Sequence, residues 1–257
     1  MKLIPCKFMK TIDSTFAGFS FCACLLFGGC VVGDKNSGNA VVKADPFASS
    51  AEPVPPKTDK AEWKVVFEAD WSDETIGEEP ADLFVLDGSY LISEKDGNKA
   101  LALPGAPVGD FGFLFGPRIK GKPVELKARI LSTRKGRRMP AFAAGLGGVN
   151  SYRLRLNPAA KTLHLSRGEE ILEKVPLEWK SGLWTNLRFR AEPKGDEGAI
   201  LSAKVWSSDE TEPADWALTF KDSESFAGGK CTLWGYPYAG TEIFFDDLSI
   251  LIFSSEE

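Results

Sequence analysis

Cysteine and histidine are scarce in this chain of 257 residues, which contains five cysteines and one histidine. Four of the cysteines, Cys6, Cys22, Cys24 and Cys30, lie within the first 30 residues, and only Cys231 follows them. A single thiol cannot form an intramolecular disulfide, so the hydrophobic core must stabilise the later part of the chain. The residues around Cys231 alternate as in a β-strand, which predicts a small buried side chain at this position.

The single histidine argues against catalytic centres that are built on histidine. His164 lies between Leu163 and Leu165, so its ring is predicted to lie on the polar face of a strand. A Ser-His-Asp triad or a histidine-based zinc site needs partner residues in a defined pattern, and none surrounds His164. Cys231 likewise has no activating histidine near it in the sequence. The sequence therefore assigns no catalytic residue.

Residues 1–29 have the layout of a secretory signal. Three lysines precede an apolar run over residues 16–27, and two glycines follow it directly before Cys30. This ending resembles the lipobox of bacterial lipoproteins, in which the cysteine is lipidated and becomes the mature N-terminus. The resemblance implies lipidation of Cys30 and export to the cell envelope, at the outer membrane or the cell surface. Ordinary cleavage and an uncleaved anchor over residues 16–32 are the alternatives.

Residues 30–60 are predicted to form the lipidated N-terminus and a disordered tether. They are rich in alanine, serine, lysine, aspartate and proline, and they show no apolar periodicity. This composition is typical of partly extended linkers. It suits a spacer between a lipid anchor and a folded domain.

The charge balance is acidic. The chain has 31 basic and 36 acidic residues, and loss of residues 1–29 removes three lysines and Asp13, which leaves 28 against 35 and a net charge of −7. Such a domain does not bind nucleic acid through bulk electrostatics. The sequence therefore predicts no nucleic-acid partner.

Short alternating runs separated by glycine, aspartate and proline fill the remainder, which predicts one all-β domain over residues 61–257. Only residues 212–220 have a pattern that suits a short helix. The last predicted strand is apolar on both faces and should lie centrally in a sheet. The predicted strands cover residues 63–71, 89–93, 100–103, 124–131, 152–156, 162–166, 183–191, 200–206, 231–235 and 242–253.

The clearest local pattern is a hairpin over residues 152–166. Tyr152, Leu154 and Leu156 are predicted to face the core, and Leu163 and Leu165 return on the same side after a turn at residues 157–160. In the later strand, Leu183, Thr185, Leu187 and Phe189 are expected to face inward.

Several segments, taken in order, resemble a known fold family. They are an opening Phe-x-x-Asp strand, the Tyr-x-Leu-x-Leu hairpin, a Trp-x-x-Leu strand, Lys-Val-Trp, residues 212–216 and the Phe-Asp-Asp-Leu-Ser-Ile ending at residues 245–250. Together they resemble the concanavalin A-like (laminin-G-like) jelly-roll domains of bacterial secreted proteins, over roughly residues 62–253. The resemblance implies an antiparallel jelly-roll β-sandwich and, in many relatives, sugar binding. Fold alone does not determine function.

The outward positions of the central strands gather cations and tryptophans. If these strands are neighbours, the side chains form one face that suits sugars, which stack on aromatic rings and bond to planar polar groups. Arginines also suit carboxylated or sulfated glycans. An ordinary solvated sheet face with cross-strand charge pairs is the alternative. The candidate carbohydrate-binding residues are Arg153, Arg155, Trp184, Arg188, Arg190, Lys204 and Trp206, with His164 on the same predicted face.

Asp246 and Asp247 are unusual because they lie inside an otherwise apolar strand. A buried carboxylate needs a cation or hydrogen-bond donors. An arginine, a lysine or backbone N–H groups are the ordinary partners. A structural Ca²⁺ completed by Asp70 or Glu68 is the alternative, because calcium prefers oxygen ligands.

The sequence thus predicts an exported, membrane-anchored lipoprotein with a non-catalytic, lectin-like domain, whose partner is a carbohydrate or cell-wall polymer. The basic segment at residues 134–138 reads as a solvated turn, or as a contact for anionic lipid or wall polymer. One alternative is a sugar-processing enzyme that resembles keto-disaccharide hydrolases or glucanases. The other is a purely structural or interaction module of the envelope.

Overall fold

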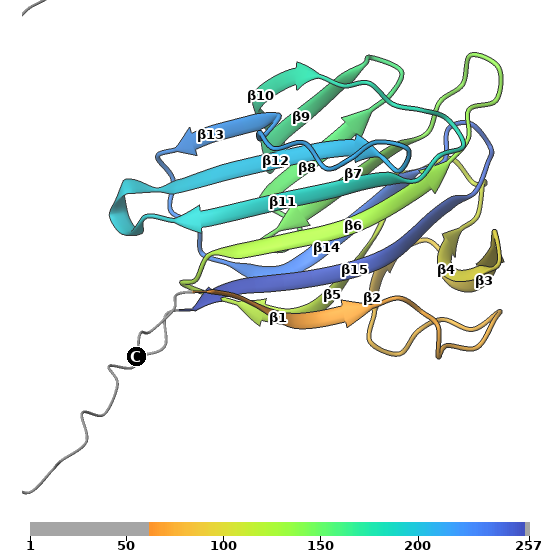
Figure 1. The fold of residues 1–257 in the computed structure, drawn as a ribbon, viewed down its shortest axis with the longest axis horizontal. Coiled ribbons are helices and arrows are strands. Elements are labelled where there is room, and N and C mark those ends of the chain that lie inside the picture. The colour runs from red at the N-terminus through yellow and green to blue at the C-terminus, as the bar shows by residue number, and fades with distance from the viewer. Residues whose placement is uncertain (1–61, 255–257) are drawn as a thin grey trace, which may run out of the picture. The chain divides into compact units, whose positions relative to one another are not determined.

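A computed structural model describes residues 62–254, which fold as a jelly-roll β-sandwich of two antiparallel sheets. Figure 1 shows the sheets stacked face to face, with one crossing in front of the other. The only helical element among these residues is a 3₁₀ turn, Gly195–Glu197. The sandwich predicted from the sequence is therefore confirmed.

The first sheet, called sheet A, has eight strands and contains both the first and the last strand. β1 and β15 pair with each other, so the two ends of the described chain lie side by side in this sheet. β15 also pairs with β6 and β4, which places it centrally. In spatial order the strands are β13 (Leu218–Asp222), β12 (Ala199–Ser207), β11 (Thr185–Pro193), β6 (Val124–Ser132), β15 (Ile243–Ser254), β4 (Asn98–Leu103) and β3 (Leu91–Lys95), with β1 (Glu62–Ala69) beside β15.

The second sheet, called sheet B, has seven strands, and local hairpins build half of it. β8 and β9 pair directly through the predicted hairpin, and β10 continues from β9. In spatial order the strands are β10 (Glu170–Pro176), β9 (Thr162–Arg167), β8 (Tyr152–Asn157), β7 (Ala141–Leu146), β14 (Gly229–Tyr236), β5 (Phe111–Ile119) and β2 (Phe84–Asp87).

Aromatic side chains join the two sheets at the centre of the core. Phe113 of β5 packs edge-on against Phe245 of β15, with 5.7 Å between ring centroids. Tyr90 packs against Phe113 from the side, at 4.8 Å. All three rings are fully buried. Such edge-to-face contacts add to the free energy of burying the rings themselves.

All ten strands predicted from alternation overlap observed strands, but β2, β5, β7, β10 and β13 were not predicted. β7 shows why, because all six of its residues are apolar and buried, so its sequence lacks the alternation of apolar and polar residues. The helix expected over residues 212–220 is wrong. Pairing of Leu218 with Ala203 extends sheet A there as β13, so tertiary contacts override the local pattern. Leu183 is also exposed instead of buried, because β11 begins after it.

The central strand β15 is covered on both faces, as expected. Phe245 and Ile250 face the core and are fully buried. On the outer face, Phe244 packs with Leu131 and with the partly buried Trp184. The core also takes up Cys231, which is buried as predicted, and burial raises the pKa of its thiol to about 12.

An arginine satisfies the two aspartates of β15. The Arg129 guanidinium on β6 lies 2.7 Å from Asp246 Oδ2 and 2.9 Å from Asp247 Oδ2, at a bulge in the pairing of these strands. Asp70, the third carboxylate considered for calcium, instead accepts hydrogen bonds from the backbone N–H and hydroxyl of Ser72. Residues 62–254 contain no group of three or more histidine, cysteine, aspartate or glutamate side chains placed to hold a metal ion.

Several predictions concern residues that the structure does not describe. The signal segment, the lipidation of Cys30 and the tether over residues 30–60 lie outside residues 62–254. Within the described range no helix is both long and apolar enough to cross a lipid bilayer.

A buried carboxylate ties the two sheets together at one edge. Asp222, at the end of β13, accepts a hydrogen bond of 2.9 Å from the Tyr152 hydroxyl of β8, and it pairs with Arg167 of β9. Burial acts to raise the pKa of Asp222, but hydrogen bonds from the Glu224 N–H, Tyr152 and Arg167 outweigh it and lower the pKa. The carboxylate therefore stabilises the fold above the ordinary value of 3.8, and this contribution is lost as the pH falls through the lowered pKa.

We expect Asp222→Asn to lower the free energy of unfolding at neutral pH by about 2 kcal/mol, because it removes a buried charged acceptor. The variant should also lose stability less steeply than the parent when the pH is lowered below about 4. Urea unfolding at neutral and acidic pH measures both effects. Asp196→Asn, in the exposed 3₁₀ turn, is the control and should follow the parent curve.

Candidate functional site

The structure divides the candidate binding residues between opposite faces of the sandwich. Sheet B carries Arg153, Arg155 and His164 on its outer side. Sheet A carries the other five, because β11 and β12 belong to it. The expectation of a single face is therefore wrong, and its cause is the β10–β11 connection, which crosses from one sheet to the other. The residues on sheet A are Trp184, Arg188, Arg190, Lys204 and Trp206.

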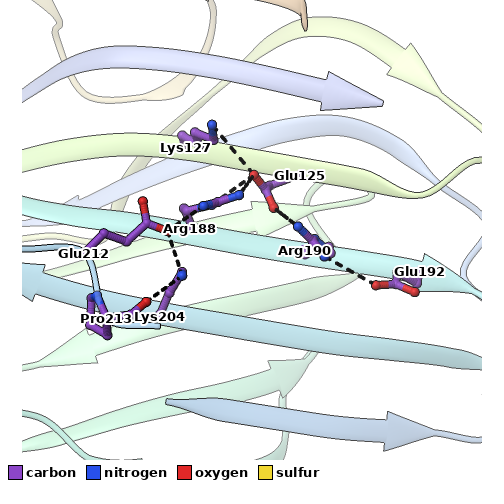
Figure 2. A network of polar contacts seen from close by, with 8 residues as sticks. All are labelled: Glu125, Lys127, Arg188, Arg190, Glu192, Lys204, Glu212 and Pro213. Atoms are coloured by element: carbon purple, nitrogen blue, oxygen red, sulfur yellow. Dashed lines mark hydrogen bonds and ion pairs between the residues drawn. The ribbon is translucent and has the colours of Figure 1, made fainter. Parts of the chain in front are cut away.

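On sheet A the arginines are committed to a buried glutamate. Glu125 of β6 is 1% exposed, and it accepts hydrogen bonds from Arg188 and Arg190 of β11 at 2.7–3.0 Å. Figure 2 shows both guanidinium groups pointing at this one carboxylate. Burial acts to lower the pKa of Arg188, but the bonds to Glu125 and Glu212 outweigh it and raise the pKa.

The loop between β12 and β13 closes over these charges. Glu212 from this loop lies 2.6 Å from Lys204 Nζ, which also donates to the Pro213 carbonyl at 2.7 Å (Figure 2). The Trp216 ring lies over Arg190 and Lys204, with centroid distances of 4.8 and 5.0 Å. Each cation of this network thus has a carboxylate partner within the domain. They stabilise the outer side of sheet A and offer few free donors to a ligand.

The two candidate tryptophans of sheet A are partly buried. Trp184 packs on Phe244, and the Arg129 guanidinium lies 4.7 Å from its ring centroid. It therefore covers β15 and the ion pair beneath. Trp206 lines a depression of about 580 Å³ together with Asn186, Arg188 and Glu68. This depression is open and carries both charges, so a ligand there would compete with existing ion pairs.

Sheet B presents a different arrangement, in which an arginine crosses one strand to reach a tryptophan. Arg153 of β8 lies over the Trp234 ring of β14, 3.8 Å from its centroid. β7 lies between these strands, so the side chain spans roughly 10 Å of sheet. It passes because the intervening outward residues, Ala143 and Gly145, are small. Trp234 in turn lies over Gly112 of β5, where a Cβ atom would overlap the ring.

Within residues 62–254 the neighbouring Arg155 has one carboxylate partner, Asp110, which it shares with Arg153. Asp110 Oδ2 lies 3.0 Å from Arg153 Nη1 and 3.5 Å from Arg155 Nη1. Arg155 also lies 5.8 Å from the centroid of the Tyr236 ring. Two cations therefore share one anion here, which leaves an excess of positive charge. Burial lowers the pKa of Arg153, against the opposing effect of Asp110.

Two tyrosines extend the aromatic surface. The rings of Tyr236 and Tyr238 are stacked at 5.9 Å with 15° between their planes, and Tyr238 is 48% exposed. An exposed flat ring next to cationic donors is the arrangement in which sugars bind by stacking and hydrogen bonding. We call the residues Arg153, Arg155, Trp234, Tyr236 and Tyr238 the arginine–aromatic strip.

His164 adds no charge to this surface. It faces Arg155 across β8 and β9, and its Nε2 lies 2.6 Å from the Thr162 hydroxyl. Burial first, and then the charges of Lys174 and Arg155, lower its pKa from the usual 6.5. The imidazole is thus neutral at pH 7, and it has a hydroxyl partner on its own strand.

Sequence reasoning missed the aromatic half of the strip. Thr232, Trp234 and Tyr236 alternate in the sequence with Cys231, Leu233 and Gly235, although Thr232 and Trp234 are also buried in the structure. Extending the alternation by one residue beyond Gly235 would have placed Trp234 and Tyr236 on an outer face. Asp110 precedes β5 in a loop and carries no such pattern.

Comparison with known proteins relates this chain to solved structures of the same fold. No family model matches the sequence, and no curated protein matches it. The carbohydrate recognition domain of Emp46p in its metal-free form has a TM-score of 0.54 and 9% identity, covering 76% of this chain and all of that one. The CBM2 module of the evolved Dit of Lactobacillus casei BL23 phage J-1 has a TM-score of 0.52 and 12% identity, and the match covers 77% of this chain and all of the module. The PL-14 alginate lyase of Aplysia kurodai has a TM-score of 0.51 and 13% identity, and the match covers 64% of this chain and 87% of the lyase. At these identities the likeness establishes the fold.

Proposed function

We propose that this protein is an exported, lipid-anchored carbohydrate-binding lipoprotein, and that its glycan lies along the arginine–aromatic strip of sheet B. The observation that carries the proposal is the pair of arginines that share a single carboxylate beside an exposed, stacked tyrosine pair. Arginine binds carboxylates and sulfates in two-point geometry, whereas tyrosine rings stack on the apolar faces of sugars. The strip therefore favours an acidic polysaccharide.

The comparisons support a glycan as the ligand. The solved structures with this fold include a carbohydrate recognition domain, a carbohydrate-binding module and an alginate lyase. Both binding proteins and enzymes have this fold, so the choice between these functions has to be argued from the residues of the site. The strip holds donors and rings but no pair of close carboxylates, since Asp110 is the acid that contacts its arginines. This favours binding over glycoside hydrolysis.

The proposed location, at a membrane surface outside the cytoplasm, rests on the first 30 residues. A lipid on Cys30 and a tether of about 30 residues would hold the β-sandwich at a membrane surface and leave the strip free to meet a polymer. Labelled palmitate should enter the wild-type protein and not the Cys30→Ala variant. If neither the wild-type protein nor the Cys30→Ala variant is labelled while the chain is still exported, a lipid on Cys30 is excluded. Ordinary signal cleavage then becomes the better explanation of export.

Binding to polysaccharides tests the proposed site. We expect alginate and polygalacturonate to bind more tightly than the neutral glucan laminarin, and added salt to weaken binding, because exposed charges are screened. Tyr238→Ala should weaken binding about tenfold through lost stacking, and Arg155→Gln by a similar factor. Isothermal titration or affinity electrophoresis measures these changes.

Lys127→Gln provides the matched control, because it removes one cation from the depression on sheet A and leaves the strip intact. Its affinity should equal that of the parent. If Lys127→Gln weakens binding and the strip variants do not, the glycan lies on sheet A instead. If new reducing ends or unsaturated products appear in the same incubations, the protein is an enzyme and the binding role is incomplete.

A further inference from the structure

A separate pocket lies at the end of the sandwich where three loops meet. It has a volume of about 520 Å³, which is within the range of small-molecule sites. Its walls come from the β6–β7 loop, the β8–β9 turn and the β10–β11 connection. None of its residues belongs to the arginine–aromatic strip, so it is independent of the proposed function.

Hydrogen bonds between the loops hold this pocket open. The Arg134 N–H donates to Ser181 Oγ at 2.9 Å, which joins the β6–β7 loop to the β10–β11 connection. The Leu177 N–H donates to the Lys161 carbonyl at 3.0 Å, which joins the same connection to the β8–β9 turn. Lys161 has a φ of 54°, an unfavourable conformation for a side chain other than glycine. The pocket is therefore built into the fold.

The floor of the pocket is apolar. Leu177 is buried, and Trp179 packs on Phe142 of the core with 6.0 Å between ring centroids. The Trp179 Nε1 group is buried and has no hydrogen-bond partner among residues 62–254.

The rim is cationic. Arg134 and Lys161 line the pocket, and neither side chain has an ion-pair partner within the described range. Lys180 is already paired with Asp209 and Glu210. Glu178 also lines the pocket and offers an acceptor for hydroxyl groups.

We propose that this pocket binds a single uronic acid, as a free sugar or at the end of a chain. The carboxylate would bind to the Arg134 and Lys161 side chains. The apolar floor would receive the face of the sugar ring, and Glu178 would accept hydrogen bonds from hydroxyl groups. A carboxylate, a ring face and hydroxyl groups together match the three kinds of lining that the pocket presents.

Glucuronate, its methyl ester and glucose test this inference by nuclear magnetic resonance. Glucuronate is expected to shift the indole N–H signal of Trp179, which the Trp179→Phe variant identifies. The uncharged ester and glucose should bind at least about tenfold more weakly, because two charged contacts are lost. Arg134→Gln combined with Lys161→Gln should weaken glucuronate to the same extent. Arg137→Gln combined with Lys120→Gln removes equal charge outside the pocket and should leave the affinity unchanged.

Three results would overturn the inference. An unmoved Trp179 signal at saturating glucuronate would show that the pocket takes no uronic acid. Equal shifts with glucuronate and its ester would exclude recognition of the charge. Competition by inorganic phosphate at the same concentration as glucuronate would show that the site takes anions without reading a sugar ring.

Discussion

Replacing Arg188 and Arg190 together with methionine is expected to lower the free energy of unfolding by about 3–5 kcal/mol. Both guanidinium groups bind Glu125, which is almost fully buried. Without them the carboxylate is left buried and without its two hydrogen-bonding partners, and Lys127 lies 3.9 Å from it. The loss arises from the stranded charge and less from the broken bonds.

Removing the charge should rescue the protein. Adding Glu125→Leu to the double variant replaces the buried glutamate and both of its arginine partners with apolar side chains, which is often neutral for stability. Urea unfolding measures the midpoints, and an unchanged slope shows that the same surface becomes exposed. If the double variant unfolds like the parent, or if Glu125→Leu gives no recovery, the network does not support sheet A. Binding to polysaccharides by folded variants should remain, because the strip lies on the other sheet.

This network also shows what alternation could and could not predict. The outward phase of Arg188, Arg190 and Lys204 was correct, because side chains in a strand alternate between faces. Of the two roles expected for them, cross-strand charge pairing is the one that the structure shows, but the sequence did not identify Glu125 or Glu212 as the partners. Ion pairing between β6, β11 and the loop before β13 is a tertiary property that the local pattern does not contain.

The division of candidates between two faces has a similar cause. The β8–β9 hairpin and the β11–β12 pair have the same alternating pattern, so both predict a sheet with one polar face. The sheet that each strand pair joins depends on the segment that connects the two pairs. Here residues 177–184 lead from one sheet to the other, and packing sets their path. The core was easier to predict, since Tyr152, Leu154 and Leu156 are buried wherever the hairpin lies.

Replacing Trp234 with alanine is expected to lower the free energy of unfolding by about 3 kcal/mol and to abolish measurable binding of acidic polysaccharide. The ring is 8% exposed, and its Nε1 donates to Thr232 Oγ1 at 3.0 Å. It fills the space above Gly112 and supports the Arg153 guanidinium. Its removal opens a void and releases the arginine from its position in the strip.

Trp234→Phe separates the two effects. A phenyl ring keeps much of the buried area and still lies beneath Arg153, so we expect a stability loss of about 1–2 kcal/mol and partial retention of binding. Urea unfolding and titration with alginate on the same preparations give both quantities. Full binding by a folded Trp234→Ala variant would exclude Arg153 and its ring support from the site.

A double-mutant cycle with Gly112 locates the ring independently of any ligand. Gly112→Ala in the parent places a methyl group against Trp234 and should cost more than about 1 kcal/mol. In the Trp234→Ala background the same change meets empty space and should cost nothing. It should even recover part of the loss, because alanine suits a strand better than glycine does. Equal costs in both backgrounds would mean that the ring does not lie on Gly112, and the path by which Arg153 crosses β7 would lose its physical basis.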